Sequence, residues 1–203
     1  MPYILILIGC LGLTTSSLGI DLYEIQQLDV AAVTWMNLHR SNFISEIAIF
    51  LSKIGGLPAM LCVCAAACLI SYRLKKYIYI HLICFSFFGA ACINWALKYI
   101  FDRPRPDAVY QMVQTYGASY PSAHSLYATI LSCLMVLIFR QHHYARYIFI
   151  MACLWSIGMG ISRVYLGVHF PTDILAGWSI AFIWIGVLWS QFKPFMVNEN
   201  NLI

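Results

Sequence analysis

The chain has 203 residues, of which 62% are hydrophobic and only 10% are charged. A soluble domain usually carries about 25% charged residues, so this composition excludes an ordinary soluble domain and favours a protein with several membrane spans. The net charge of +4 does not indicate nucleic-acid binding, because the basic residues form neither a Lys/Arg-rich block nor a stripe.

Six apolar stretches are long enough, alone or with flanking residues, to predict membrane-spanning helices. We interpret the first as a retained span rather than a cleaved signal peptide, because no positive charge precedes it. The sequence therefore predicts an all-α, multi-pass membrane protein with about six transmembrane helices. We expect a single domain over residues 1–203 with its core at 45–192. The six stretches are residues 3–20, 57–72, 77–101, 122–139, 147–161 and 174–192.

The segment after the first apolar stretch is more polar and predicts a helix at the membrane surface. Between about residues 22 and 42, apolar side chains recur at helical spacing, which is typical of an amphipathic helix. Gly55, Gly56 and Pro58 then interrupt the chain before the second span. The recurring apolar residues are Ile25, Leu28, Ala32, Trp35 and Leu38.

The eight cysteines all lie in apolar stretches. Cys62, Cys64 and Cys68 are close in sequence, but no second Cys or His pair with metal-ligand spacing accompanies them. We therefore interpret the cysteines as small apolar helix residues rather than as a metal or redox cluster.

Ionisable residues gather at one end of the predicted bundle. Because successive spans alternate in direction, the ends of the third and fifth spans meet the starts of the fourth and sixth on one side. Three cations, two histidines and a carboxylate suit a highly charged oxyanion, and phosphate is the obvious candidate. These residues are Lys98, Arg105, His124, Arg163, His169 and Asp173.

The same residues form three sequence blocks that resemble the signature of the type 2 phosphatidic acid phosphatase family. The order and spacing of the blocks match that signature, although Ala123 stands where the family usually has glycine. The blocks are Lys98 and, after six residues, Arg105–Pro106; Pro121–Ser122–Ala123–His124; and Ser162–Arg163, five residues, His169, three residues, Asp173.

This resemblance implies phosphoryl transfer in two steps. His169 would attack phosphorus and form a phosphohistidine, while Asp173 would orient the imidazole and stabilise its developing charge. His124 would protonate the leaving oxygen and then take a proton from the hydrolytic water. These three residues are the predicted catalytic residues.

The phosphate oxygens would be bound by cations and by a helix start. Lys98, Arg105 and Arg163 would hold the oxygens, and Ser122 with the first amides of the fourth span, beginning at Ala123, would add hydrogen bonds. We expect no metal and no cofactor, because three fixed cations already supply positive charge and no carboxylate cluster is present to hold magnesium.

Three further features lie beside these blocks. We expect Ala123 to cause no strain, which requires that its backbone not adopt a positive φ. Arg103 lies outside the signature and is interpreted as a loop or headgroup contact. The polar and aromatic segment 107–120 is expected to cap the headgroup of a substrate.

The basic residues also predict an orientation. Each side of the predicted bundle receives six Lys or Arg residues. Lys98, Arg105 and Arg163 are set aside because their positions are fixed by chemistry, which leaves six against three. The positive-inside rule then places the site at the outer face of the cytoplasmic (inner) membrane.

We therefore expect a membrane lipid phosphatase, with no nucleic-acid partner. Its substrate would be a lipid phosphate or prenyl diphosphate, such as phosphatidic acid, phosphatidylglycerol phosphate or a polyprenyl diphosphate. One alternative is a lipid phosphotransferase that uses the same phosphohistidine. Another is a vanadium-dependent haloperoxidase, which the membrane spans disfavour. The third is a non-catalytic lipid-binding or transport protein, which the complete set of histidines and Asp173 disfavours.

Overall fold

The computed structural model describes the backbone of residues 2–200 and the side chains of residues 2–195. Within the described backbone all regular structure is helical, which confirms the predicted all-α class. The helices are α1 (Pro2–Gly19), α2 (Tyr23–Leu38), α3 (Asn42–Ile54), α4 (Leu57–Arg73), α5 (Tyr77–Phe101), the short 3-10 helix η1 (Ala108–Tyr110), α6 (Ala123–Ile138), α7 (Ala145–Tyr165) and α8 (Pro171–Asn200).

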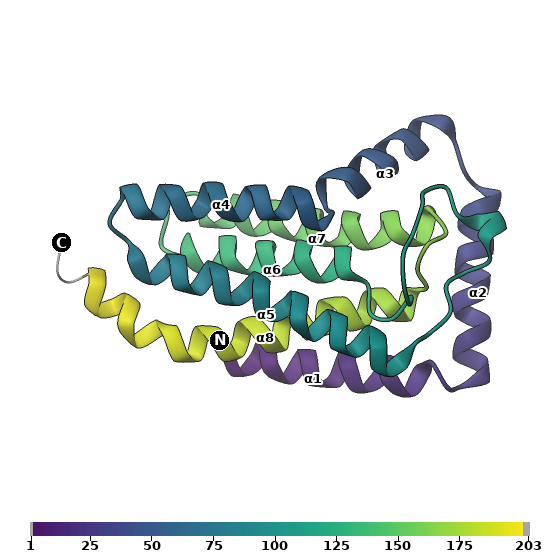
Figure 1. Cartoon of the computed structure of the whole chain (residues 1–203), viewed down its shortest axis with the longest axis horizontal. Helices are drawn as coiled ribbons and strands as arrows, with labels where there is room; N and C mark the ends of the chain where they lie inside the picture. The colour runs from purple at the N-terminus through teal and green to yellow at the C-terminus, as the bar shows by residue number, and fades with distance from the viewer. Residues whose placement is uncertain (1, 201–203) are drawn as a thin grey trace.

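Six of these helices form a bundle that is closed at one end by α2. Figure 1 shows α1, α4, α5, α6, α7 and α8 running along a common direction, whereas α2 crosses one end. Helix α8 packs against α1, α5 and α6. Helix α3 leads from this end into α4 with a bend of 56°.

The multi-pass prediction is confirmed, although the candidate spans are fewer than six. Helices α1, α5, α7 and α8 are each long and apolar enough to cross a bilayer, and the bent pair α3–α4 would make a fifth span. Helix α6 has only 16 residues. Its Leu126, Ala128 and Ile130 are fully buried, so protein rather than lipid surrounds much of this shorter helix.

The predicted surface helix corresponds to α2, which ends four residues earlier than expected and is followed by a separate helix, α3. Helix α2 ends at Leu38, and α3 begins at Asn42 after Ser41, whose side chain accepts a hydrogen bond from the Ile44 amide at 3.4 Å. Three residues of the predicted apolar stripe of α2 point outward, with Leu28 64%, Trp35 56% and Leu38 74% exposed, whereas Ile25 and Ala32 are half-buried. An outward apolar stripe suits a helix that lies at the surface of a bilayer.

The last two helices extend beyond the predicted spans. Helix α7 continues through Ser162 and Arg163 to Tyr165, and α8 begins at Pro171 instead of residue 174. Hydropathy alone ends these spans early because polar residues occupy their site-facing ends. The polar groups are instead satisfied by hydrogen bonds within the protein, for example Ser162 Oγ to the Met159 carbonyl at 2.7 Å.

The hydrophobic core lies between α4, α5, α6 and α8. Its buried members pack along these helices and fix their spacing, so the polar ends of α5, α6 and α8 are held together at the α2 end of the bundle. The core includes Met60, Leu82, Ile83, Phe87, Leu126, Ile130, Ile180 and Ile185.

Candidate active site

The start of α6 lies directly against the start of α8. Ser122 is the N-cap of α6, and its hydroxyl accepts hydrogen bonds from the Ser125 amide and hydroxyl at 3.5 and 3.1 Å. The Ser122 amide donates to the Asp173 carbonyl at 3.0 Å. A Cβ on Gly177 would lie 2.7 Å from the Ser122 carbonyl oxygen, so glycine permits this close approach. Ala123 is the first residue of α6 and is not among the residues with positive φ, as expected.

His169 and Asp173 form a buried pair at the start of α8. Their exposed fractions are 2% and 0%. His169 Nδ1 lies 3.4 Å from Asp173 Oδ2, and the same oxygen accepts from the Phe170 amide at 2.8 Å. His169 precedes α8, and Asp173 lies in the first turn of this helix, two residues after Pro171. The helix start therefore fixes the carboxylate beside the imidazole.

Arg105 faces the other nitrogen of the same imidazole. Its Nη1 lies 3.3 Å from His169 Nε2 and donates to the Val168 carbonyl at 2.9 Å. Because a guanidinium only donates, Nε2 must accept, which places the imidazole proton on Nδ1, toward Asp173. Burial lowers the pKa of His169 to about 3, against the opposing hydrogen bond and charge of Asp173. The imidazole is therefore neutral, as a nucleophile must be.

Lys98 and Arg105 meet on one loop of the segment 107–120. Lys98 Nζ donates to the Ala118 carbonyl, and Arg105 Nη2 donates to the same carbonyl at 3.2 Å. Arg105 also binds the carbonyls of Gly117 at 2.9 Å and Tyr116 at 3.0 Å. This segment thus lies over the site cations, while its contact with a headgroup stays a prediction.

His124 and Arg163 converge on Ser52 of α3. His124 Nε2 lies 3.1 Å from the Ser52 carbonyl oxygen, and Arg163 Nη1 donates to the Ser52 hydroxyl at 2.5 Å. His124 and Arg163 are therefore linked through a single residue, Ser52. Among the described side chains, Arg163 Nε is one of the few buried polar atoms without a hydrogen-bond partner.

Arg103 makes contacts with helix residues that its interpretation as a loop or headgroup contact did not include. Its side chain is only 11% exposed and forms two ion pairs, with Asp173 Oδ1 at 2.7 Å and with Asp29 Oδ2 at 2.8 Å. Its guanidinium also lies 4.5 Å from the centre of the Phe170 ring. Arg103 is therefore part of the support of the candidate site, and its contact with a headgroup stays a prediction.

Three further residues of this site are absent from the sequence prediction. Ser119 Oγ donates to Asp173 Oδ2 at 2.5 Å and lies 3.4 Å from His169 Nδ1, while Ser52 and Asp29 come from α3 and α2. Ser52 and Ser119 carry no sequence signal. Asp29 does carry one, because at helical spacing it falls on the apolar face of α2 between Ile25 and Ala32; in the structure it is 2% exposed.

All eight predicted site residues lie at the α2 end of the bundle. Contacts within hydrogen-bond range join Arg105, His169 and Asp173, and Lys98 is joined to Arg105 through the Ala118 carbonyl. Ser122 is linked to Asp173 through its amide. The remaining three are Ala123 beside Ser122, and His124 and Arg163, which share Ser52.

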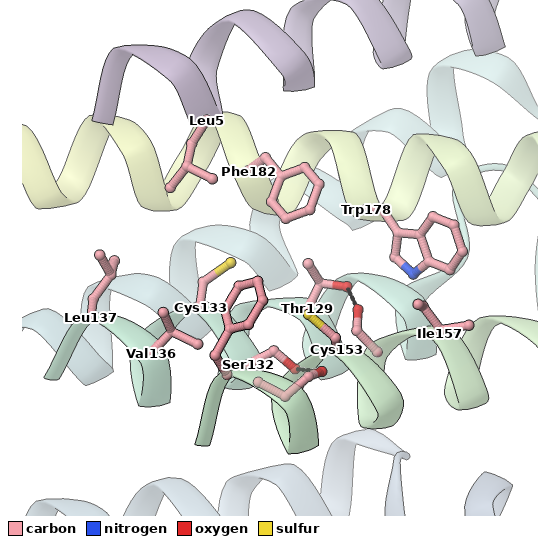
Figure 2. Close-up of a pocket in the computed structure, with 13 residues that line it drawn as sticks. Leu5, Thr129, Ser132, Cys133, Val136, Leu137, Cys153, Ile157, Trp178 and Phe182 are labelled. Atoms are coloured by element: carbon pink, nitrogen blue, oxygen red, sulfur yellow. Dashed lines mark hydrogen bonds between the residues drawn. The ribbon is translucent and has the colours of Figure 1, made fainter. Parts of the chain in front are cut away.

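A polar cleft beside the site and an apolar cavity farther along the bundle differ in character. A polar cleft of about 390 Å³ is lined by the end of α5, the α1–α2 corner, Arg103, Arg105 and Phe170. An apolar cavity of about 330 Å³ lies deeper, between α1, α6, α7 and α8. Figure 2 shows Trp178 and Phe182 of α8 pointing into it, toward α6. The predicted site residues do not line this apolar cavity.

The fold and site together define a multi-pass membrane protein whose polar end gathers cations around a buried histidine–carboxylate pair. Residues 79–196, more than half of the chain, match the model of the PAP2 superfamily. The chain belongs to the PAP2 superfamily, which confirms the family resemblance of its sequence blocks.

Individual relatives are similar to this chain in sequence, and a solved structure is similar in fold. Phosphatidylglycerophosphatase B of Bacillus subtilis is 34% identical over 96 residues, 45% of this chain and 47% of the relative, so this match spans about half the relative's length. Undecaprenyl-diphosphatase of Sulfolobus acidocaldarius is 26% identical over 163 residues, 78% of this chain and 75% of the relative. The crystal structure of a transmembrane PAP2 type phosphatidylglycerolphosphate phosphatase from Bacillus subtilis shares the fold, with a TM-score of 0.81 at 24% identity over 95% of this chain and 96% of that one.

Proposed function

We propose that this protein is an integral-membrane lipid phosphatase that hydrolyses a lipid phosphomonoester or diphosphate through a phosphohistidine on His169. The observation that carries the proposal is the neutral imidazole held between Asp173 and Arg105, with Nε2 facing the cation. A nucleophile whose attacking atom points at a guanidinium is placed where a phosphate would bind.

In the first step, Nε2 of His169 attacks phosphorus, and the bond from phosphorus to the lipid oxygen breaks. His124 donates a proton to the departing oxygen. Because the Ser52 carbonyl only accepts, it holds the Nε2 proton of His124. His124 therefore enters this step as an imidazolium, which the negative charge of the bound phosphate stabilises, donates its second proton from Nδ1, and is left neutral. The developing imidazolium of His169 is stabilised by Asp173.

In the second step, water attacks the phosphohistidine. His124 takes a proton from the water, the bond between phosphorus and Nε2 breaks, and inorganic phosphate leaves. Arg105, Lys98 and Arg163 offset the charge on the equatorial oxygens in both steps. The Arg163 Nε donor supports this role, since a buried guanidinium N–H without a partner is costly and a phosphate oxygen would satisfy it.

A lipid is the substrate class that this architecture supports best. The site lies at one end of a membrane bundle, and the polar cleft beside Arg103 and Arg105 has room for a headgroup. The relatives named for phosphatidylglycerophosphate and undecaprenyl diphosphate support a phosphorylated lipid. The charge count of the sequence supports an outward-facing site.

The test is phosphate release from a panel of phosphatidic acid, phosphatidylglycerol phosphate and a polyprenyl diphosphate by purified protein in detergent. We expect hydrolysis of at least one lipid, with or without a chelator, and a loss of at least about 10³-fold in kcat in His169→Ala. His142→Ala, a change in the exposed α6–α7 turn, is the matched control and should leave kcat unchanged.

Two results would contradict the proposal. One is the absence of phosphate release from every lipid, and the other is equal activity of wild type and His169→Ala. A water-soluble phosphate ester without a tail should show a kcat/KM at least about 10-fold lower than the best lipid, because the tail contributes binding energy. Equal kcat/KM values for the soluble ester and the best lipid would contradict a lipid as the substrate.

A further inference from the structure

Asp29, Arg103 and Asp173 form a continuous buried ion-pair chain from the surface helix α2 to the candidate nucleophile. Arg103 Nη2 donates to Asp29 Oδ2 at 2.8 Å, and Nη1 donates to Asp173 Oδ1 at 2.7 Å. The two carboxylate side chains are 3% and 0% exposed. One guanidinium therefore bridges two buried carboxylates, a geometry that the planar fork of arginine provides and lysine does not.

The bridge divides the two oxygens of Asp173 between different partners. Arg103 binds Oδ1, which leaves Oδ2 for His169 Nδ1 at 3.4 Å, the Ser119 hydroxyl at 2.5 Å and the Phe170 amide at 2.8 Å. With both oxygens held, the carboxylate cannot rotate away from the imidazole. Arg103 therefore sets which oxygen faces His169.

Asp29 anchors the opposite end of the bridge on α8 itself. Its Oδ1 accepts from the Thr172 amide at 3.1 Å, and its Oδ2 accepts from the Thr172 hydroxyl at 2.5 Å. The Thr172 amide is one of the first amides of α8, which lack partners within the helix. A carboxylate from α2 thus caps the helix that carries Asp173 and balances the charge of Arg103.

We propose that Asp29 and Arg103 are positioning residues for the phosphoryl-transfer step. Neither residue needs to touch the substrate. They hold the Asp173 carboxylate in position to accept the Nδ1–H of His169, so that Nε2 is aimed at phosphorus. The inference rests on the proposed function and extends the site to α2, a helix outside the three sequence blocks.

The test compares Asp29→Asn, Arg103→Gln and Arg103→Lys with wild type, using the panel lipid that wild type hydrolyses fastest. Glu24→Gln is the matched control, because Glu24 is an exposed carboxylate on the same helix. Inorganic phosphate serves as a competitive inhibitor that reports anion binding separately from the chemical step.

We expect Asp29→Asn to lower kcat by about 10- to 100-fold, because small misplacements of a reacting group cost this much. KM and the inhibition constant of phosphate should stay within about threefold of wild type. Arg103→Gln should lower kcat further than Asp29→Asn does, and the kcat of Arg103→Lys should lie between those of Arg103→Gln and wild type. The double variant Asp29→Asn/Arg103→Gln should lose less kcat than the product of the two single losses, since Asp29 acts in part through Arg103. Glu24→Gln should match wild type.

A second readout does not depend on turnover. The ¹⁵N signals of the His169 imidazole should shift in Asp29→Asn, a nearly isosteric change, and stay at their wild-type positions in Glu24→Gln. If Arg103→Gln fails to fold, Asp29→Asn still tests the positioning role, through the His169 signals and through kcat per folded molecule.

Three outcomes would overturn the proposal. Asp29→Asn could keep a wild-type kcat and wild-type His169 signals. It could lower only the melting temperature, which would make the bridge purely structural. The inhibition constant of phosphate could rise in parallel with the loss of kcat, which would make these residues part of the anion site. An inactive wild type would instead contradict the proposed function, and the His169 signals would still decide the inference.

Discussion

His169 lies between a guanidinium and a carboxylate, and this placement determines its protonation. Arg105 approaches Nε2 at 3.3 Å and Asp173 approaches Nδ1 at 3.4 Å. Burial disfavours the charged imidazolium, and the pKa of His169 falls from 6.5 to about 3. The unfolded chain therefore binds a proton at this residue below about pH 6.5 that the folded chain excludes, so the contribution of His169 to stability decreases as the pH falls from about 6.5 toward about 3.

The protonation of His169 can be measured directly. In ¹⁵N-histidine-labelled protein, the signal lost in His169→Ala identifies this residue. We expect it to keep the shifts of a neutral imidazole, protonated on Nδ1, from pH 8 down to about pH 5, because its pKa is about 3. A titration midpoint above pH 5, or a proton on Nε2 instead, would contradict the geometry of the site.

Among the helices, the contact between α6 and α8 most directly sets the spacing of the site. Gly177 lies against the Ser122 carbonyl, at the point where α6 starts, and Asp173 lies one turn earlier on α8. Gly158 of α7 has no heavy atom within 4 Å of where its Cβ would be. The two helix glycines therefore provide a matched pair, one at a close contact and one in open space.

Replacing each glycine by alanine should have opposite effects. Gly177→Ala should destabilise the protein by about 1–3 kcal/mol and lower kcat, because a Cβ 2.7 Å from the Ser122 carbonyl would push α6 and α8 apart. Gly158→Ala should be neutral or stabilise by up to about 1 kcal/mol through higher helix propensity. Thermal unfolding in detergent and kcat check both. Equal stability and equal kcat of the two variants would show that this contact does not determine the spacing of the site.

Elements set by neighbouring residues in the sequence could be predicted, whereas contacts between distant segments could not. Hydropathy predicts α5 to the residue because its apolar run is bounded by polar residues, whereas α7 and α8 extend into polar ends that hydropathy does not recognise as helix. His169 and Asp173 are recognisable because they fall in a short sequence block whose spacing resembles the family signature. Arg103 and Asp29 are 74 residues apart, so nothing local marks their pairing.

Across the whole molecule, the helices bring separate polar segments to a single end. The α4–α5 and α6–α7 turns lie at the opposite end (Figure 1). The excess of basic residues that are free of the site is at that opposite end. The positive-inside rule therefore favours an outward-facing site, the orientation in the proposed function.

Orientation can be tested with single cysteines in a background free of the eight natural ones. Tyr116→Cys lies at the site end, where the native side chain is 83% exposed, and His142→Cys lies in the exposed α6–α7 turn. A membrane-impermeant maleimide should label Tyr116→Cys in intact spheroplasts and His142→Cys only after permeabilisation. The reverse pattern would place the site on the cytoplasmic side.

The central claim is a covalent phosphohistidine on His169, and trapping it is the most direct test. Wild-type protein mixed with lipid carrying ³²P in its terminal phosphate and quenched within a turnover should carry label that is lost in acid and stable in alkali. The label should map to the peptide containing His169 and be absent from His169→Ala. Phosphate release by wild type without such a label, or a label on another residue, would contradict the account.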